Sequence, residues 1–297
     1  MPRQRAPWVL AVLALVAAAA PLCAQDLFPS GSRLTEPPDA RLVPPNALPE
    51  RLKFGPAHWQ DLAFYRGAGS GPHPVIVAFN GIGGWARHRL TEAGISLALV
   101  ADGRSNPTAP ETIDGLVEAL RFLDREAGTL GLDREQIVLF GVGNGGSLAT
   151  LFGTDPALFE RTGIPFANLR AVISIGGEDF DVLRRAGENA YLRSLYRRHY
   201  SRDEAELARL SPMTHLAPPN APAFLLMAEA RDENGVRESQ RMAAALAGAG
   251  AAASYAVLPD PRERVRATHF MAEETGSGRE VMPFLRSVLT LPDAPAR

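Results

Sequence analysis

Three kinds of residue in this chain could take part in one catalytic site: a carboxylate, a histidine and a set of glycines. Asp232 follows the apolar run 223–228, and His269 follows the apolar run 253–258. A carboxylate that orients a histidine makes the imidazole a general base. Ahead of both lies Gly141–Gly146, a glycine-dense stretch between an apolar strand pattern and a helix start. The order places a turn, a carboxylate and a histidine after successive predicted strands, where they could do acid–base chemistry together.

The turn at Gly141–Gly146 has the spacing of a turn that lifts a reactive side chain above a sheet, yet it carries no reactive side chain. Its letters are Gly-Val-Gly-Asn-Gly-Gly, with Gly143 where a nucleophile would stand. The strained backbone of such a turn costs about 1–3 kcal/mol for a residue with a side chain, and glycine adopts it at little cost. Ser147, one helical turn further on, is expected to face the helix packing. Gly143 therefore suits the turn while removing the nucleophile.

A second glycine-rich loop could supply backbone donors for a developing negative charge. Residues 80–85, Asn-Gly-Ile-Gly-Gly-Trp, begin at the last residue of the run 74–80, which is otherwise apolar. A strand followed by such a loop is how the N–H groups of an oxyanion hole are aimed, although the same glycines also suit a plain tight turn. The expected oxyanion-type residues are Gly81, Gly83, Gly84 and Asn144.

The two candidate catalytic side chains also have plain structural explanations. Asp232 could cap the following helix, a role worth about 1 kcal/mol. His269 could be an ordinary half-buried histidine. A metal hydrolase is not supported, because His58, His73, His88 and His269 show no ligand spacing such as H-x-x-x-H. We expect no metal and no cofactor.

Alternating strands and helices must position these residues. Apolar runs predict strands, and 3.6-residue periodicity predicts helices. The alternation favours a doubly wound, mostly parallel sheet. The polar segment 178–210 is expected to form a small helical cap. The predicted strands are 58–66, 74–80, 94–100, 136–140, 170–175, 222–228 and 253–258, and the predicted helices are 111–131, 236–249 and 279–289.

Several motifs in order carry a resemblance to a known family. They are Phe54-Gly55-Pro56 with 61–66, the loop 79–85, residues 103–110 with Asp114, the turn 141–145, and 211–216. Together they resemble the α/β-hydrolase superfamily, close to bacterial carboxylesterases of the hormone-sensitive-lipase-like and feruloyl-esterase-like groups. The resemblance covers roughly residues 54 to 290.

The resemblance implies an α/β-hydrolase fold and the carboxylic-ester hydrolase class. It places the nucleophile position at Gly143, the acid at Asp232 and the base at His269. Asn80 stands where the family has histidine. The connection 85–94 is shorter than is usual in the family, which implies that the first helix is nearly absent.

Two functional classes follow from the missing serine. No acyl-enzyme can form at Gly143, which favours a pseudoenzyme that binds a small ester or acid, or a protein partner. Deleting one triad member still leaves a rate of roughly 10³–10⁴ over water. An active esterase that uses His269, Asp232 and the Gly81–Gly84 loop by a variant mechanism is therefore the alternative.

The N-terminus has the pattern of a secretory signal peptide. Arg3 and Arg5 precede an apolar run from 8 to 20, which is too short to span a membrane. We expect a signal peptide at 1–24, cut after Ala24 or within the preceding alanine run, and a periplasmic or secreted protein with no stable membrane span after processing. Cys23 is the only cysteine, and Leu22 before it argues against a lipid anchor.

Composition limits the rest. Residues 25–55 are rich in proline and are expected to form a leader, followed by one α/β-hydrolase domain at 56–291. The chain has 297 residues and a formal net charge of -2. A nucleic-acid-binding protein usually shows a basic excess, so no nucleic-acid partner is predicted.

Overall fold

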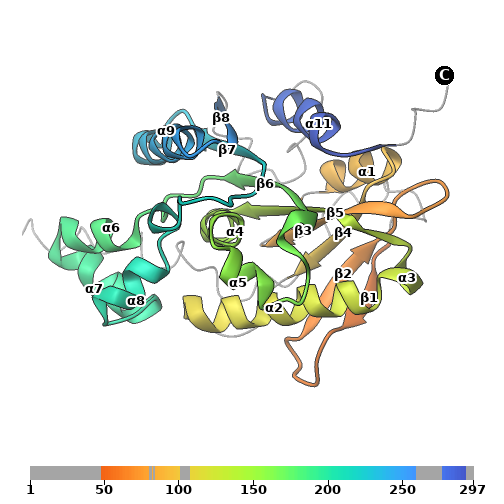
Figure 1. Cartoon of the computed structure of the whole chain (residues 1–297), viewed down its shortest axis with the longest axis horizontal. Helices are drawn as coiled ribbons and strands as arrows, with labels where there is room; N and C mark the ends of the chain where they lie inside the picture. The colour runs from red at the N-terminus through yellow and green to blue at the C-terminus, as the bar shows by residue number, and fades with distance from the viewer. Residues whose placement is uncertain (1–47, 80–81, 83, 101–107, 259–275, 292–297) are drawn as a thin grey trace, which may run out of the picture.

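The computed structural model describes residues 48–79, 82, 84–100, 108–258 and 276–291 (Figure 1). Its centre is an eight-stranded sheet in the order β1-β2-β4-β3-β5-β6-β7-β8. β1 and β2 pair antiparallel, as do β2 and β4, and all other neighbours are parallel. This confirms the predicted α/β-hydrolase fold. The strands are β1 (Glu50–Lys53), β2 (Asp61–Tyr65), β3 (His73–Phe79), β4 (Ser96–Val100), β5 (Leu132–Val142), β6 (Leu169–Ile175), β7 (Ala223–Glu229) and β8 (Ala252–Leu258).

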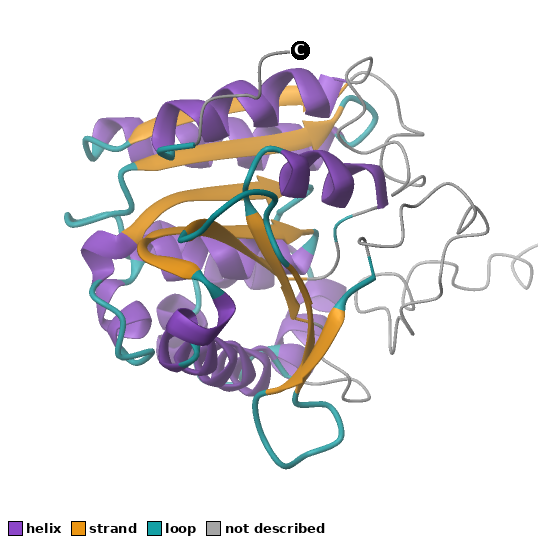
Figure 2. Ribbon diagram, turned by 90° about the vertical axis from the view of Figure 1, so that its right-hand side faces the viewer, coloured by secondary structure: helices purple, strands orange, loops and turns teal. Residues whose placement is uncertain are grey.

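Helices cover both faces of the sheet, as Figure 2 shows. They are α1 (Gly84–Glu92), α2 (Ala109–Arg125), α3 (Ala127–Leu130), α4 (Asn144–Thr154), α5 (Pro156–Glu160), α6 (Val182–Glu188), α7 (Ala190–His199), α8 (Glu204–Arg209), α9 (Glu233–Gly248) and α11 (Gly276–Val288). Short 3-10 turns lie at Phe166–Asn168 and Pro212–Thr214.

Strand alternation divides the core into two layers. Val75, Val77 and Phe79 of β3 belong to a buried cluster that includes residues of α2, α4, α5 and α9. Ile76 and Ala78 belong to a second cluster with residues of α1 and α11. Successive side chains of a strand point to opposite faces, so a continuous apolar run fits a sheet covered on both sides.

Two elements differ from the sequence expectations. The expectation that the first helix is nearly absent is wrong, because α1 runs for nine residues and its Leu90 is 2% exposed. The proline-rich stretch contributes β1, whose sequence Glu-Arg-Leu-Lys is polar and mostly exposed. Such a strand has no apolar run to predict it.

The polar segment after β6 forms the helices α6, α7 and α8. Figure 1 shows them gathered at one end of the molecule, away from α1 and α11. In the part of the chain that the structure describes, no helix has the length and apolar character needed to cross a membrane.

Candidate active site

The turn between β5 and α4 has the backbone of a side-chain-presenting elbow. Gly143 lies between the two elements with φ +57° and ψ -126°. Its N–H donates to the carbonyl of Ile175 at 2.7 Å, and its carbonyl accepts the N–H of Gly146 at 2.9 Å. Among the described residues, nothing lies within 4 Å of where a Cβ of Gly143 would stand. The turn therefore has room for a side chain that the sequence does not provide.

The neighbouring glycines are required by close backbone contacts. A Cβ at Gly141 would lie 2.0 Å from the carbonyl oxygen of Gly145. A Cβ at Gly145 would lie 2.5 Å from the carbonyl oxygen of Phe79, at the end of β3. Helix α4 thus packs directly against the sheet, and these two glycines serve the fold rather than chemistry.

Ser147 does not serve as a substitute nucleophile in this arrangement. Its side chain lies on α4 and is 4% exposed. Its hydroxyl oxygen accepts the backbone N–H of Asp179 at 3.0 Å. The hydroxyl is therefore used to hold the loop that follows β6, in keeping with the expectation that it faces the helix packing.

Asp232 lies in the loop after β7 and caps helix α9. Its carboxylate accepts the N–H of Gly235 at 2.9 Å. The capping role considered from the sequence is thus confirmed. The acid role of Asp232 stays a prediction, because His269 lies outside the described residues.

A second carboxyl group, Glu178, lies beside Asp232. Glu178 follows β6, and its side chain is hydrogen-bonded to that of Asp232. The side-chain N–H of Asn234 donates to Glu178 at 2.8 Å, and Arg185 approaches the same carboxylate at 3.3 Å. Loops from the ends of two neighbouring parallel strands therefore bring two acids together.

Burial, and then the negative charge of Asp232, together raise the pKa of Glu178 to about 7. The hydrogen bond from Asn234 opposes the rise. The guanidinium of Arg185 also contacts Glu188 and Asn234. With its pKa at about 7, Glu178 is mostly protonated below neutral pH.

A tyrosine network ties the helical cap to the elbow. Tyr196 donates its hydroxyl to Asp179, and the hydroxyl of Tyr200 lies 2.9 Å from the same carboxylate. Tyr200 also contacts the side-chain amide of Asn144 at 3.0 Å. Burial, followed by the charge of Asp179, raises the pKa of both phenols well above the usual tyrosine value. Both tyrosines therefore stay protonated, as hydrogen-bond donors.

The sequence prediction missed Glu178 and Asp179 as site residues. The signal was available, since Gly176-Gly177-Glu178-Asp179 follows a buried strand just as Asp232 does. The carboxyl ends of parallel strands meet at one edge of a sheet. The pairing with Asp232 and the tyrosine contacts join distant segments, which no local pattern reveals.

Several predicted site residues are not described by the structure. His269, Gly81 and Gly83 lie outside the described residues, and Gly84 is described only as the first residue of α1. The proposed oxyanion roles of Gly81, Gly83, Gly84 and Asn144 stay predictions. Within the described ranges, no group of three or more His, Cys, Asp or Glu side chains could hold a metal ion.

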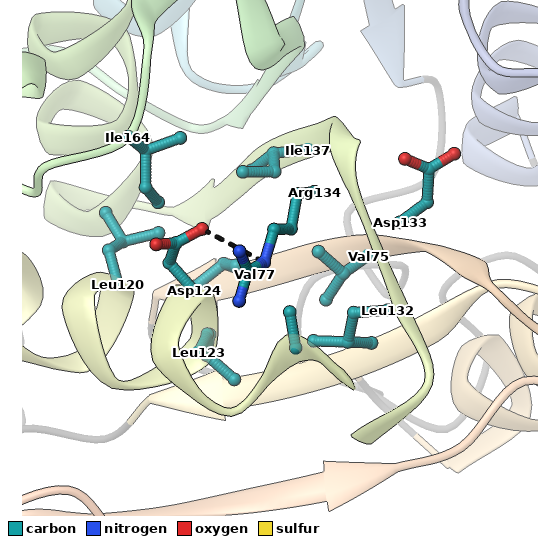
Figure 3. Close-up of a pocket in the computed structure, with 11 residues that line it drawn as sticks. Val75, Val77, Leu120, Leu123, Asp124, Leu132, Asp133, Arg134, Ile137 and Ile164 are labelled. Carbon is teal, nitrogen blue, oxygen red and sulfur yellow. Dashed lines mark ion pairs between the residues drawn. The ribbon is translucent and has the colours of Figure 1, made fainter. Parts of the chain in front are cut away.

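A small pocket elsewhere in the molecule belongs to the core rather than to this site. It lies near the start of β5, beside Leu132 and Ile137, whereas the elbow follows the end of that strand. Apolar side chains line most of it, and the ion pair of Arg134 with Asp124, 3.6 Å apart, crosses its rim (Figure 3). This pocket contributes no residue to the candidate site.

Comparison with known proteins supports the same fold and an esterase family. A family model described as BD-FAE matches residues 64–246. No curated protein matches the sequence. Solved structures do match, although at identities that speak only to the fold.

Among the solved structures, esterase Est2 of the planctomycete Thermogutta terrifontis is 20% identical, with a TM-score of 0.57, 72% of this chain covered and 82% of that chain. Esterase B from Lactobacillus Rhamnosis is 18% identical, with a TM-score of 0.62, 80% of this chain covered and 84% of that chain. A truncated carbohydrate esterase from gut microbiota is 15% identical, with a TM-score of 0.58, 73% of this chain covered and 90% of that chain. Est2 has also been solved with propionate and with butyrate bound.

Proposed function

Since the chain belongs to the BD-FAE family of α/β-hydrolase esterases, we propose that it is a pseudoenzyme: it keeps the esterase fold but lacks serine-nucleophile catalysis. One observation carries the proposal. Gly143 stands at the elbow between β5 and α4, with a positive φ and with no described atom within 4 Å of a Cβ position. A hydrolase of this fold presents its serine on that turn.

The ligand we propose for the site is a small carboxylic ester or the acid derived from it. The family supports this class, and the propionate- and butyrate-bound forms of Est2 supply the first compounds to test. The N-terminal pattern supports export to the periplasm or outside the cell as part of the proposal. Ligand binding and export are both compatible with a protein that does not hydrolyse esters.

Restoring the nucleophile tests the proposal. The wild-type protein is expected to leave a short-chain p-nitrophenyl ester unhydrolysed and a fluorophosphonate probe unreacted. Gly143→Ser is expected to gain esterase activity by about 10³-fold over Gly143→Ala, since one missing triad member costs at least that much. Gly143→Ala is the matched control, because it carries the same backbone strain without a hydroxyl.

One result would contradict the proposal, and a second would show how far the site has changed. Rapid turnover by the wild-type protein, together with labelling of one of its serines, would show a functional nucleophile elsewhere. A folded Gly143→Ser variant without activity would show that the remaining machinery is not poised. Combining Gly143→Ser with Asp232→Asn keeps a capping side chain on α9, and loss of the gained activity there would assign the acid role to Asp232.

A further inference from the structure

Helix α7 and the segment that follows it carry several exposed basic side chains. We call Tyr191, Arg193, Arg197, Arg198 and Arg202 the α7 outer face. All of them are exposed, and Tyr191 is one of the few large hydrophobic side chains exposed among the described residues, at 56%. Between residues 190 and 202 the sequence has no acidic residue.

The helix geometry separates this face from the candidate site. Tyr196, His199 and Tyr200 are buried on the opposite side of α7, where the tyrosines reach Asp179. At 100° per residue, positions 191, 193, 197 and 198 fall on the remaining arc. Tyr191 and Arg198 therefore face away from the tyrosines that contact Asp179, whereas Arg193 and Arg197 lie on the flank of the helix nearer to Tyr200.

The arginines of the outer face lack the partners that nearby arginines have. On α6, Arg184 pairs with Glu188 and Glu238, and Arg185 pairs with Glu178 and Glu188. Within the described part of the chain, the arginines of the α7 outer face have no ion-pair partner. Two of them, Arg193 and Arg197, are like charges at i and i+4, which repel on a helix.

Helix stabilisation explains only part of this set. Basic residues in the last turn interact favourably with the helix dipole, which accounts for Arg197 and Arg198. Arg193 lies in the first half of α7, and Arg202 lies beyond its end. The positive charge of this set acts on a neighbouring residue: burial, and then the charge of Arg198, lower the pKa of His199. The outer face is therefore an uncompensated positive surface.

We propose that the α7 outer face is a docking surface for a short acidic segment of a partner protein. Guanidinium groups match carboxylates through paired hydrogen bonds. Tyrosine and arginine are enriched at the centres of protein interfaces and among their hot spots. The surface thus combines the side chains that bind a protein segment rich in Asp or Glu.

The limits of the surface favour a short segment over an extended polyanion. Asp203 and Glu204 follow Arg202 directly and are exposed, so a nucleic acid or an anionic membrane that continued past the arginines would meet like charge. Membrane binding also uses several inserted apolar side chains, and Tyr191 is the one large apolar side chain exposed on α7. This inference concerns a surface outside the pocket and does not depend on the pseudoenzyme proposal.

Binding of a fluorescent peptide of ten glutamates, followed by anisotropy at low and at high salt, tests the surface. Wild-type protein is expected to bind it with an affinity that falls as salt rises. Arg193→Gln/Arg197→Gln/Arg198→Gln is expected to lose at least tenfold in affinity. The matched control is Arg170→Gln/Arg231→Gln/Arg279→Gln, which removes the same charge from exposed arginines elsewhere and is expected to stay within twofold of wild type.

Other outcomes overturn the proposal. Equal losses in the two triple variants would show a net-charge effect without a site. Tighter wild-type binding to a 20-nucleotide DNA or to phosphatidylglycerol vesicles than to the peptide would assign the surface to a different class of partner. Tyr191→Ala, which changes no charge, is expected to weaken peptide binding several-fold, and an unchanged affinity would remove the tyrosine from the surface. Circular dichroism of each variant checks that the helices are retained.

Discussion

The elbow at Gly143 and the pair of acids at the ends of β6 and β7, which we call the acidic edge, differ in what the sequence provides there. At the elbow the backbone geometry is kept and the side chain is missing, since Gly143 has room for a group it lacks. At the ends of β6 and β7 there are two carboxyl side chains, Glu178 beside Asp232, where a catalytic triad needs one. The elbow backbone is held by contacts that the fold itself requires. A carboxyl pair has no such structural necessity, because burying two acids together costs stability.

The largest expected effect is a difference in stability between alanine substitutions at two glycines of the elbow, Gly141 and Gly143. Gly141→Ala places a Cβ 2.0 Å from a backbone carbonyl oxygen and is expected to lower the free energy of unfolding by about 3 kcal/mol or more. Gly143→Ala meets no described atom outside its own turn, so only its positive φ destabilises the variant, by about 1–3 kcal/mol. Urea denaturation of both variants measures the difference. Equal losses would show that the whole turn, and not only its flanking glycines, is held by packing.

A smaller, pH-dependent effect on the free energy of unfolding is expected at the acidic edge, from Glu178. The pKa of Glu178 is about 7 in the folded protein against 4.5 for the free side chain, so the folded state binds more protons than the unfolded state between these values. The free energy of unfolding should therefore fall as the pH rises from about 4.5 to about 7. Glu178→Gln should remove this decline and be more stable than wild type at pH 8 by about 1–2 kcal/mol, a figure reduced for a side chain that is 33% exposed.

Urea denaturation at several pH values measures this effect. Asp232→Asn retains a capping side chain and removes one of the two largest causes of the raised pKa, so its decline should move to lower pH. A Glu178→Gln variant that keeps the wild-type decline would show that other groups cause it.

The smallest effect concerns the link between the two regions. Tyr200→Phe removes the hydroxyl that joins Asn144 of the elbow to Asp179 of the acidic edge. Its loss should cost about 1 kcal/mol, as for a buried hydrogen bond. Tyr191→Phe removes an exposed hydroxyl and serves as the control in the same denaturation series. If both variants lose the same amount, the network contributes no stability.

Much of the fold could be predicted because strands buried on both faces leave continuous apolar runs. β3 and β7 are such strands, and both begin and end within one residue of their predicted limits. β1 could not be predicted in this way, since a polar edge strand is stabilised by its pairing with β2 and not by burial.

The candidate site was partly predictable for a related reason. Asp232 follows an apolar run, and the glycines at 141–146 mark a tight turn, so both could be placed from local sequence. The raised pKa of Glu178 depends on its burial and on the nearby charge of Asp232, which lies beyond α6, α7, α8 and β7 in the chain. Contacts of that kind arise only when the chain is folded.

The position of β1 determines how the molecule responds to being held by its N-terminal region. β1 is the first strand of the described fold and lies at the edge of the sheet, where it contacts β2 through the pairs Glu50–Phe64 to Lys53–Asp61. A pulling force applied there would peel a short ribbon from the sheet one residue pair at a time. β1 would therefore separate before the central strands and the elbow that follows β5.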